Sequence, residues 1–339
     1  MENNSFVNVI IESKIPFVDD RLDGIARVTR LDPDEFTPEA VAGADAIIVR
    51  TRTKVNEALL GASNVKFVAT ATIGTDHIDI EWCRANGIAV ANAPGCNAPG
   101  VAQYVLASVI GQGYGIGSDT TVGIVGVGHV GRIVEQWARS LGFSVLLCDP
   151  PRARMEGHEG FAGLDELAEK ADVITFHTPL VKNGIDATYH LISDEFLAAC
   201  QRCPLIINAA RGAVADTDAL IRAVEKGRVR RPVIDCWEGE PFISDRLLQL
   251  AAVATPHIAG YSFEGKVRAT QMALDSFTGY FGLPHARTLE GIDMSVAPSP
   301  SAASIAASYS PIADTANLLA NPGAFESLRN NYSYRKEPR

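Results

Sequence analysis

A glycine-rich segment constrains the fold of this chain more than any other feature of its sequence. Gly126-Val-Gly-His-Val-Gly131 follows an apolar run, residues 121–125, and precedes a segment of helical character, residues 130–141. In a strand–turn–helix unit, the first glycine permits the turn, the second lets the backbone approach a pyrophosphate, and the third allows close helix–strand packing. The next apolar run ends at Asp149, 18 residues after Gly131, where a carboxylate can accept hydrogen bonds from ribose hydroxyls. This arrangement predicts a dinucleotide site.

The predicted dinucleotide site comprises Gly126, Gly128, His129, Val130, Gly131 and Asp149. A carboxylate at residue 149 would repel a 2′-phosphate, so the sequence favours NAD over NADP as the cofactor. Arg152 lies three residues further on and leaves NADP open as the alternative cofactor. A glycine turn in a protein that binds no nucleotide is the other alternative.

Short β-branched runs separated by helix-length segments predict the fold class. One series covers residues 7–11, 46–49, 65–68 and 88–90, and a second covers residues 121–125, 144–147, 173–176, 205–207 and 233–234. This alternation is typical of parallel sheets covered by helices. We therefore predict an α/β protein with two doubly wound parallel-sheet domains, one flavodoxin-like and one of the Rossmann type, and a short C-terminal extension.

Composition narrows the classes of partner. The chain has 339 residues, 47% of them hydrophobic and 21% charged, and a formal net charge of −10, which fits a globular protein without general attraction to nucleic acid or anionic membranes. No apolar run reaches the length of a spanning helix, and the amino terminus does not resemble a signal peptide, so we expect a cytoplasmic location. Cys200-Gln-Arg-Cys203 lacks a second ligand pair, and we therefore predict no metal site.

Three dispersed side chains form a second constellation. Arg211, Glu240 and His257 each follow the carboxyl end of a predicted strand, the edge where ligands bind in open parallel sheets. An imidazole exchanges protons near neutral pH, a neighbouring carboxylate orients it, and a guanidinium pairs with a substrate carboxylate. Each residue alone has an ordinary structural explanation, such as an ion pair or a buried histidine. Together, beside NAD, they predict hydride transfer on a 2-hydroxy acid.

Several longer strings carry a family resemblance. The chain resembles the D-isomer-specific 2-hydroxyacid dehydrogenases over residues 7–282, and faintly again over residues 322–332. The matching strings are Val49-Arg-Thr-Arg-Thr-Lys-Val-Asn56, Thr70-Ala-Thr-Ile-Gly-Thr-Asp-His77, Ala93-Pro-Gly-Cys-Asn97, Leu147-Cys-Asp-Pro-Pro-Arg152, Phe176-His-Thr-Pro-Leu180, Asp235-Cys-Trp-Glu-Gly-Glu-Pro241 and Pro256-His-Ile-Ala-Gly-Tyr261. Within the family, the strings around Asp149 and His257 resemble members that oxidise 4-phospho-D-erythronate to 3-hydroxy-2-oxo-4-phosphooxybutanoate in the synthesis of pyridoxal 5′-phosphate (vitamin B6).

The resemblance implies a role for individual residues. His257 would donate and accept the proton, Glu240 would be its partner, and Arg211 would clamp the substrate. Contacts with NAD are implied for Asp149, Thr178, Asp235 and Gly260, and contacts with substrate for Thr51, Thr72 and Tyr261. For the substrate phosphate, the local cations are Arg50, Arg52, Lys54 and Lys266, of which Arg50 is our first choice.

The resemblance also implies a domain plan. We expect a substrate (lid) domain over residues 1–95, completed by 261–285, an NAD-binding domain over 96–260, and a short C-terminal segment over 286–339. A homodimer is expected through the apolar helix near Val101–Val109. Two departures from the family pattern are Gln103, where a glutamate is common, and a carboxyl-terminal segment shorter than in relatives.

Two other functions stay open from the sequence. A related dehydrogenase acting on glycerate, lactate or phosphoglycerate would share the same three residues and cofactor loop. A non-catalytic, NAD-sensing protein of the corepressor kind would share the fold. The sequence also leaves open whether NAD is released after each turnover or is reoxidised in place by a 2-oxo acid.

Overall fold

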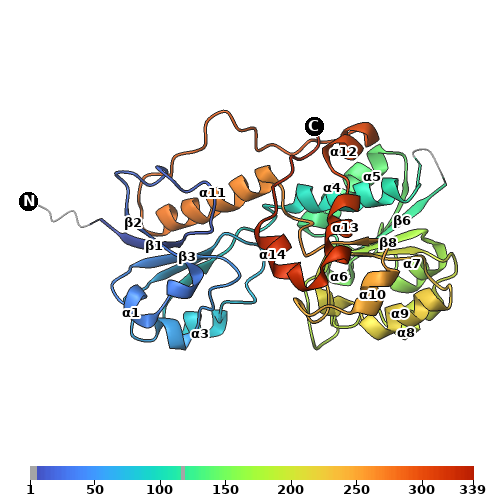
Figure 1. The fold of residues 1–339 in the computed structure, drawn as a ribbon, viewed down its shortest axis with the longest axis horizontal. Coiled ribbons are helices and arrows are strands. Elements are labelled where there is room, and N and C mark those ends of the chain that lie inside the picture. The colour runs from blue at the N-terminus through green and yellow to red at the C-terminus, as the bar shows by residue number, and fades with distance from the viewer. Residues whose placement is uncertain (1–5, 116–118) are drawn as a thin grey trace, which may run out of the picture. The chain divides into compact units, whose positions relative to one another are not determined.

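The computed structural model describes residues 6–115 and 119–339, and its chain divides into two compact units (Figure 1). Unit 1 comprises the residues up to Asn97 together with Phe263–Ser295. Unit 2 comprises Ala98–Ser262 and Val296–Arg339. Within the described ranges, no helix is both long enough and apolar enough to cross a membrane.

Unit 1 is built on a parallel sheet of five strands in the order β2-β1-β3-β4-β5. The strands are β1 (Asn8–Glu12), β2 (Arg27–Leu31), β3 (Ala46–Val49), β4 (Phe67–Thr70) and β5 (Ala89–Ala91). This is the strand order of flavodoxin-like sheets. The edge strand β2 was not predicted, because its sequence Arg-Val-Thr-Arg-Leu is mostly exposed and has no apolar run.

Helices cover both faces of the unit 1 sheet, as expected for buried parallel strands (Figure 1). One face packs against α11 (Phe263–Tyr280) through Ala273, Leu274 and Phe277. The other face packs against α1 (Pro38–Val41), α2 (Glu57–Leu60) and α3 (Ile80–Ala85). The 3₁₀ turn η1 (Pro33–Glu35) precedes α1.

Unit 2 contains a parallel sheet of six strands in the order β11-β10-β9-β8-β6-β7. The strands are β6 (Thr121–Val125), β7 (Ser144–Cys148), β8 (Val173–Phe176), β9 (Leu205–Asn208), β10 (Val233–Ile234) and β11 (Val253–Ala254). The strand order reverses at β6, which pairs with both β7 and β8, so the switch point of the sheet lies at the end of β6.

Two layers of helices cover the unit 2 sheet. One layer contains α4 (Ala98–Gly111), α5 (His129–Ser140) and α12 (Ala302–Ser308). The other contains α7 (Leu164–Lys170), α8 (Asp194–Ala199), α9 (Thr217–Glu225), α10 (Asp245–Leu250), α13 (Ile312–Ala320) and α14 (Phe325–Asn330). Shorter elements are α6 (Pro150–Glu156) and the 3₁₀ turns η2 (Gly212–Val214) and η3 (Pro322–Ala324).

The predicted fold class is confirmed, since both units are α/β structures on doubly wound parallel sheets. The segment from Val296 to Arg339 packs into unit 2, because Leu318 and Phe325 join one of its cores and Ile305 and Tyr309 the other. The apolar helix α4 is buried from Ala98 to Val109. Its apolar composition is therefore accounted for within the chain, and a homodimer through this helix stays a prediction.

Candidate active site

The glycine loop after β6 has the geometry that the sequence predicted for it. Gly126 has φ +86°, and a Cβ there would lie 2.9 Å from the backbone of His177. A Cβ on Gly131 would clash with the carbonyl oxygen of Gly126, so this glycine allows α5 to pack against the end of β6. A Cβ on Gly128 would meet nothing within 4 Å. The loop is therefore tight at its two ends and open in the middle, beside the amino terminus of α5.

Asp149, which follows the neighbouring strand β7, and Arg152, in the first turn of α6, hold this loop in place by hydrogen bonds. Asp149 Oδ2 accepts from the amide of Val127 at 2.8 Å, and Oδ1 accepts from the amide of Arg152 at 3.1 Å and so caps α6. The Arg152 guanidinium donates to the carbonyl of Val127 at 2.8 Å and pairs with Glu156 at 2.7 Å. Because Glu156 neutralises Arg152, this arginine offers little to a 2′-phosphate, and the geometry favours NAD.

Two buried polar atoms lie beside the glycine loop without a protein partner. Thr178 Oγ1 and His177 Nδ1 have no hydrogen-bond partner among the described residues. The methyl of Thr178 would lie 3.0 Å from a Cβ on Gly126, so the threonine lines the loop. Buried polar atoms are rarely left without a partner in native proteins. The open Gly128 backbone, the helix terminus and the Thr178 hydroxyl therefore fit a bound dinucleotide.

Glu240 and His257 form a hydrogen-bonded pair. His257 Nδ1 lies 2.9 Å from Glu240 Oε2 and 3.1 Å from Oε1. Glu240 Oε1 also accepts from the amide of Trp237 at 2.8 Å, which fixes the carboxylate. The side chains of His257 and Glu240 are 29% and 19% exposed. With Nδ1 turned to the carboxylate, Nε2 is the ring nitrogen left to exchange a proton with a substrate.

Electrostatics favour the charged form of both partners. Burial opposes the charged imidazole, but the contacts with Cys236 and Glu240 raise the pKa of His257 well above its ordinary value. Burial likewise opposes the charged carboxylate, but the hydrogen bond and charge of His257 lower the pKa of Glu240. A raised pKa means that the neutral form of His257, which can accept a proton, becomes abundant only at a higher pH than for an ordinary histidine.

Asp235 holds the loop that carries His257. Its buried carboxylate accepts from Thr255 Oγ1 at 2.7 Å, from the amide of Ile258 at 2.7 Å and from the amide of Ala259 at 3.0 Å. These bonds stabilise a loop in which His257 has φ +56°, a conformation that L residues rarely adopt. Both carboxylate oxygens are engaged by this loop. Contacts of Asp235 and of the nearby Gly260 with NAD stay predictions.

Arg211 lies on the loop after β9, the strand next to β10 in the sheet. The side-chain amide of Asn208 donates to the backbone carbonyls of Arg211 and Cys236 at 3.0 and 3.1 Å. It therefore ties the Arg211 loop to the loop that carries Glu240. A Cβ on Gly212 would clash with the carbonyl of Trp237. Arg211, Glu240 and His257 thus follow three adjacent strands, β9, β10 and β11, on backbones that touch one another.

The predicted substrate residues other than Tyr261 belong to unit 1. Glu12, at the end of β1, accepts from the amide of Arg50 at 2.8 Å and from Thr53 Oγ1 at 2.9 Å, while the Arg50 guanidinium donates to the carbonyl of Lys14 at 2.7 Å. Thr72 Oγ1 donates to the carbonyl of Gly74 at 3.0 Å. The side chains of Thr51, Arg52 and Lys54 are exposed, and Lys266 is half-buried on α11. Their contacts with substrate stay predictions.

The carboxyl-terminal segment contributes residues that the sequence did not reveal. Arg335 is 8% exposed and donates to the carbonyls of Ile258 and Gly100, each at 3.0 Å, and to the carbonyl of Ala259. Its guanidinium also lies 4.2 Å from the ring centre of Tyr309. Residue 335 bridges to Ser262, whose hydroxyl donates to Glu337 at 2.7 Å. The segment therefore clamps both ends of the loop 258–262.

Gln103 completes this clamp from α4, and its amide explains the departure from the family pattern. Gln103 Oε1 accepts from Arg335 Nε at 2.9 Å, and Nε2 donates to the carbonyl of Lys336 and to Ser308 Oγ, each at 2.8 Å. A glutamate could accept from Arg335 but could not donate to Lys336. An amide is therefore the better partner for this segment.

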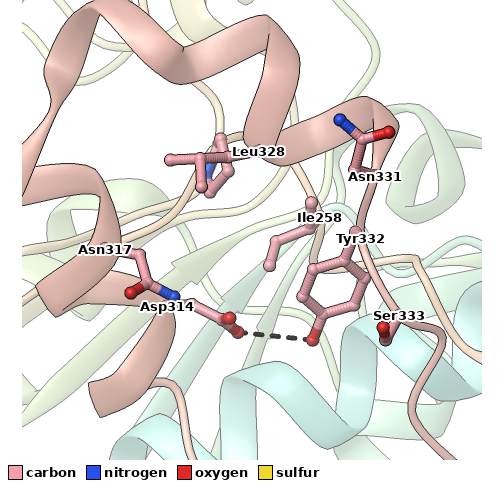
Figure 2. Close-up of a pocket in the computed structure, with 8 residues that line it drawn as sticks. Ile258, Asp314, Asn317, Leu328, Asn331, Tyr332 and Ser333 are labelled. Atoms are coloured by element: carbon pink, nitrogen blue, oxygen red, sulfur yellow. Dashed lines mark hydrogen bonds between the residues drawn. The ribbon is translucent and has the colours of Figure 1, made fainter.

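Arg329 brings a further cation to the same side of unit 2. Its Nε donates to Tyr261 Oη at 3.3 Å, and its charge helps to lower the pKa of Glu240. Next to it, a pocket is lined by Pro256 and Ile258, which flank His257, and by residues of α13, α14 and the chain that follows them. Figure 2 shows Tyr332 within this pocket, with its hydroxyl pointing to Asp314. The basic, aromatic composition of residues 325–339 was the only sequence signal for these contacts.

Comparison with known families places this geometry in context. The model of the family described as "D-isomer specific 2-hydroxyacid dehydrogenase, NAD binding domain" matches residues 114–259. Curated relatives with the name erythronate-4-phosphate dehydrogenase include proteins of Bacteroides thetaiotaomicron, Porphyromonas gingivalis and Escherichia coli. They are 43%, 42% and 38% identical to this chain over 98% of its length, and the matches cover 97%, 94% and 92% of the relatives. The expected shortening of the carboxyl-terminal segment is therefore small against these relatives.

Solved structures show the same architecture. The D-lactate dehydrogenase of Aquifex aeolicus, complexed with NAD and lactic acid, has a TM-score of 0.67 at 25% identity, over 81% of this chain and 96% of that one. An acyclic imino acid reductase in complex with NADPH and D-Arg has a TM-score of 0.69 at 19% identity, over 83% and 100% of the two chains. The second likeness supports the fold alone.

Proposed function

The chain belongs to the D-isomer-specific 2-hydroxyacid dehydrogenase family, and we propose that it oxidises 4-phospho-D-erythronate to 3-hydroxy-2-oxo-4-phosphooxybutanoate with NAD, in the synthesis of pyridoxal 5′-phosphate. The NAD-binding domain of this family covers residues 114–259, which confirms NAD as the cofactor and the protein as an NAD-dependent dehydrogenase. The names of the relatives support the phosphorylated four-carbon substrate. They do not favour a glycerate, lactate or phosphoglycerate dehydrogenase or a corepressor-like protein.

The observation that carries the proposal is the Glu240–His257 pair at 2.9 Å, on the loops after β10 and β11, in the same unit as the Arg211 loop and the glycine loop. NAD supplies the hydride acceptor when bound. His257 Nε2 takes the proton of the C2 hydroxyl, and Glu240 stabilises the imidazolium that results. Arg211 presents the planar fork that matches a carboxylate and orients C2. Gly126–Gly131 and Thr178 hold the cofactor, with Asp149 bracing the loop.

Phosphate recognition is the part of the proposal that rests on the residues of unit 1. Arg50 and Lys266 are the first candidates, with Thr51 and Thr72 as hydroxyl donors to substrate. In unit 2, Tyr261 would contact substrate, and the hydrogen bond that it accepts from Arg329 at 3.3 Å adds Arg329 as a further candidate cation.

The proposal extends to the organisation of the protein. We assign the substrate (lid) role to residues 1–95 with 261–285, the NAD-binding role to 96–260, and a role in dimerisation to 286–339. A homodimer in the cytoplasm is part of the same proposal. Light scattering at concentrations above and below the micromolar range tests the dimer, which would be refuted by a single monomeric mass throughout.

The proposed reaction is tested by measuring formation of 3-hydroxy-2-oxo-4-phosphooxybutanoate from 4-phospho-D-erythronate, with NADH recorded alongside it, in the presence and in the absence of a 2-oxo acid acceptor. We expect turnover with this acid and little with D-erythronate, D-glycerate, D-lactate or 3-phosphoglycerate. Turnover that needs the 2-oxo acid would mean that NAD is reoxidised in place. Equal turnover with the unphosphorylated acid would refute the substrate, and absence of any oxo-acid product with every acid and acceptor would refute the enzymatic class.

Variants test the proposed base with a matched control. His257→Asn should lower turnover by roughly 10²- to 10⁴-fold and leave NAD affinity nearly unchanged. His190→Asn is the control, because His190 also has a positive φ, of 51°, is 29% exposed, and contacts a carboxylate, Glu238, at 2.7 Å. Equal effects of the two changes would remove His257 from the mechanism.

A further inference from the structure

A cysteine lies beside the proton-transfer pair and has no part in the proposed reaction. The sulfur of Cys236, a carboxylate oxygen of Glu240 and a ring nitrogen of His257 all lie within 4.8 Å of one another. We propose that these three side chains form a binding site for a thiophilic divalent cation, of which Zn²⁺ is the probe, and that its binding reversibly inactivates the enzyme. The prediction of no metal site considered the Cys200 and Cys203 pair, and this site uses another cysteine.

The donor set and its spacing fit zinc. Zn²⁺ binds sulfur at about 2.3 Å, imidazole nitrogen at about 2.0–2.1 Å and carboxylate oxygen at about 2.0–2.2 Å, so tetrahedral ligand atoms lie about 3.5 Å apart. Glu240 Oε2 and His257 Nδ1 are 2.9 Å apart and have to separate by roughly 0.5 Å, and the sulfur of Cys236, which lies within 4.8 Å of both, has to approach by at most about 1.3 Å to complete such a set. The thiol of Cys236 donates a hydrogen bond to the carbonyl of Ala210 at 3.4 Å. Because thiols are weak donors, this bond opposes the movement only slightly.

The surroundings leave one side of the site open. Cys236 is 2% exposed, whereas the side chains of Glu240 and His257 are 19% and 29% exposed, so a cation reaches the sulfur from the side of the pair. Three protein ligands leave a fourth position for water, the pattern of zinc sites that are not purely structural. Cys236 and Glu240 share the loop after β10, and His257 follows β11, the neighbouring strand. The ligands therefore come from a well-supported part of the sheet edge.

Inactivation follows from the protons that zinc replaces. Binding removes the thiol proton of Cys236 and the proton shared by Glu240 and His257, and both go to solvent with no change of oxidation state. A histidine that ligates zinc and has lost its carboxylate partner cannot accept the hydroxyl proton of the substrate. A chelator that removes the ion restores the pair, so the inhibition is reversible.

Co²⁺, a spectroscopic substitute for Zn²⁺, tests the binding without reference to any substrate. The wild-type protein should take up one equivalent with a thiolate-to-cobalt absorption in the near ultraviolet, and Zn²⁺ should displace it. Cys236→Ala should lose this absorption. Cys203→Ala is the matched control, since it removes a more accessible thiol and should keep the absorption. This experiment stands apart from the proposed function, and its result holds even if the substrate proves to be a different acid.

Activity measurements test the consequence. Zn²⁺ should inhibit oxidation of the acid by the wild type, EDTA should reverse the inhibition, and Cys236→Ala should raise the zinc concentration for half-inhibition at least about tenfold, since even loss of an outer-shell partner weakens metal affinity by about 10- to 100-fold. Each variant is compared with its own metal-free activity. Equal zinc sensitivity of Cys236→Ala and wild type, or its loss in Cys203→Ala, would overturn the proposal. So would the lack of a thiolate band in folded wild type saturated with Co²⁺, which decides the matter even if Cys236→Ala does not fold.

Discussion

The buried imidazole of His177 makes the stability of unit 2 depend on pH in a way that can be calculated. His177 follows β8, and its Nε2 lies 3.0 Å from Thr175 Oγ1. Burial lowers the pKa of His177 from 6.5 to about 3. Between these two values, the unfolded chain binds a proton that the folded protein does not bind. Stability should therefore be highest above about pH 6.5 and should decrease as the pH falls toward 3.

The size of the effect follows from the pKa difference. Each pH unit below 6.5 lowers the free energy of unfolding by ~1.4 kcal/mol. His177 should therefore account for a loss of ~2 kcal/mol in the free energy of unfolding between about pH 7.5 and about pH 5. His177→Gln keeps a hydrogen-bonding side chain but has no proton to gain. The variant should lose ~2 kcal/mol less than the wild type over the same interval, whatever its stability at pH 7.5.

Denaturant unfolding without NAD, followed by tryptophan fluorescence in a Trp82→Phe background, measures this difference. The remaining tryptophans, Trp137 and Trp237, are buried in unit 2 and report on it. His158→Gln is the control, because it makes the same substitution at an exposed histidine. The reasoning fails if His177→Gln and wild type lose the same free energy between the two pH values, or if the His177 ring titrates near 6.5 in a histidine NMR titration.

Three further predictions concern the site. Gly131→Ala forces a Cβ onto the carbonyl of Gly126, and overpacking of about 1–3 kcal/mol should weaken NADH binding, measured by fluorescence titration, roughly tenfold or more. Arg335→Met removes the donors to loop 258–262 and should lower kcat more than it weakens NADH binding; a change confined to NADH affinity would count against the clamp. Glu240→Gln removes the charge that helps to raise the pKa of His257. In a plot of oxidation rate against pH, measured with chelator present, the rise on the acid side should therefore move to lower pH. An unchanged position of this rise would contradict the pairing of Glu240 with His257.

The sequence predicted the parts of this fold that depend on local chemistry. The turn at Gly126 and the packing at Gly131 could be read from residue type and spacing, because only glycine suits both positions. Strand β2 escaped prediction because it is a polar edge strand. Hydrophobic periodicity carries little information for such elements.

Site residues that follow neighbouring strands of one sheet could be predicted from the sequence, whereas contacts between segments far apart in the chain could not. Arg211, Glu240 and His257 could be expected at one sheet edge, because each follows a strand of the same parallel sheet. Arg335 binds residues about 75 positions earlier in the chain, and no sequence pattern near Arg335 indicates this contact. From the sequence alone, a buried arginine in a basic tail cannot be distinguished from an exposed one. Likewise, nothing in the sequence indicated that Asp149 would brace the amide of Val127.

The contact at Gly212 limits how this active site can be redesigned. The backbone of Gly212 lies directly against the carbonyl of Trp237. The loop that carries Arg211 can therefore approach the loop that carries Glu240 this closely only because residue 212 has no side chain. Libraries that vary residue 212 would mostly yield inactive proteins. Mutagenesis aimed at accepting bulkier acids should instead keep this glycine and diversify the exposed residues Thr51, Arg52 and Lys54.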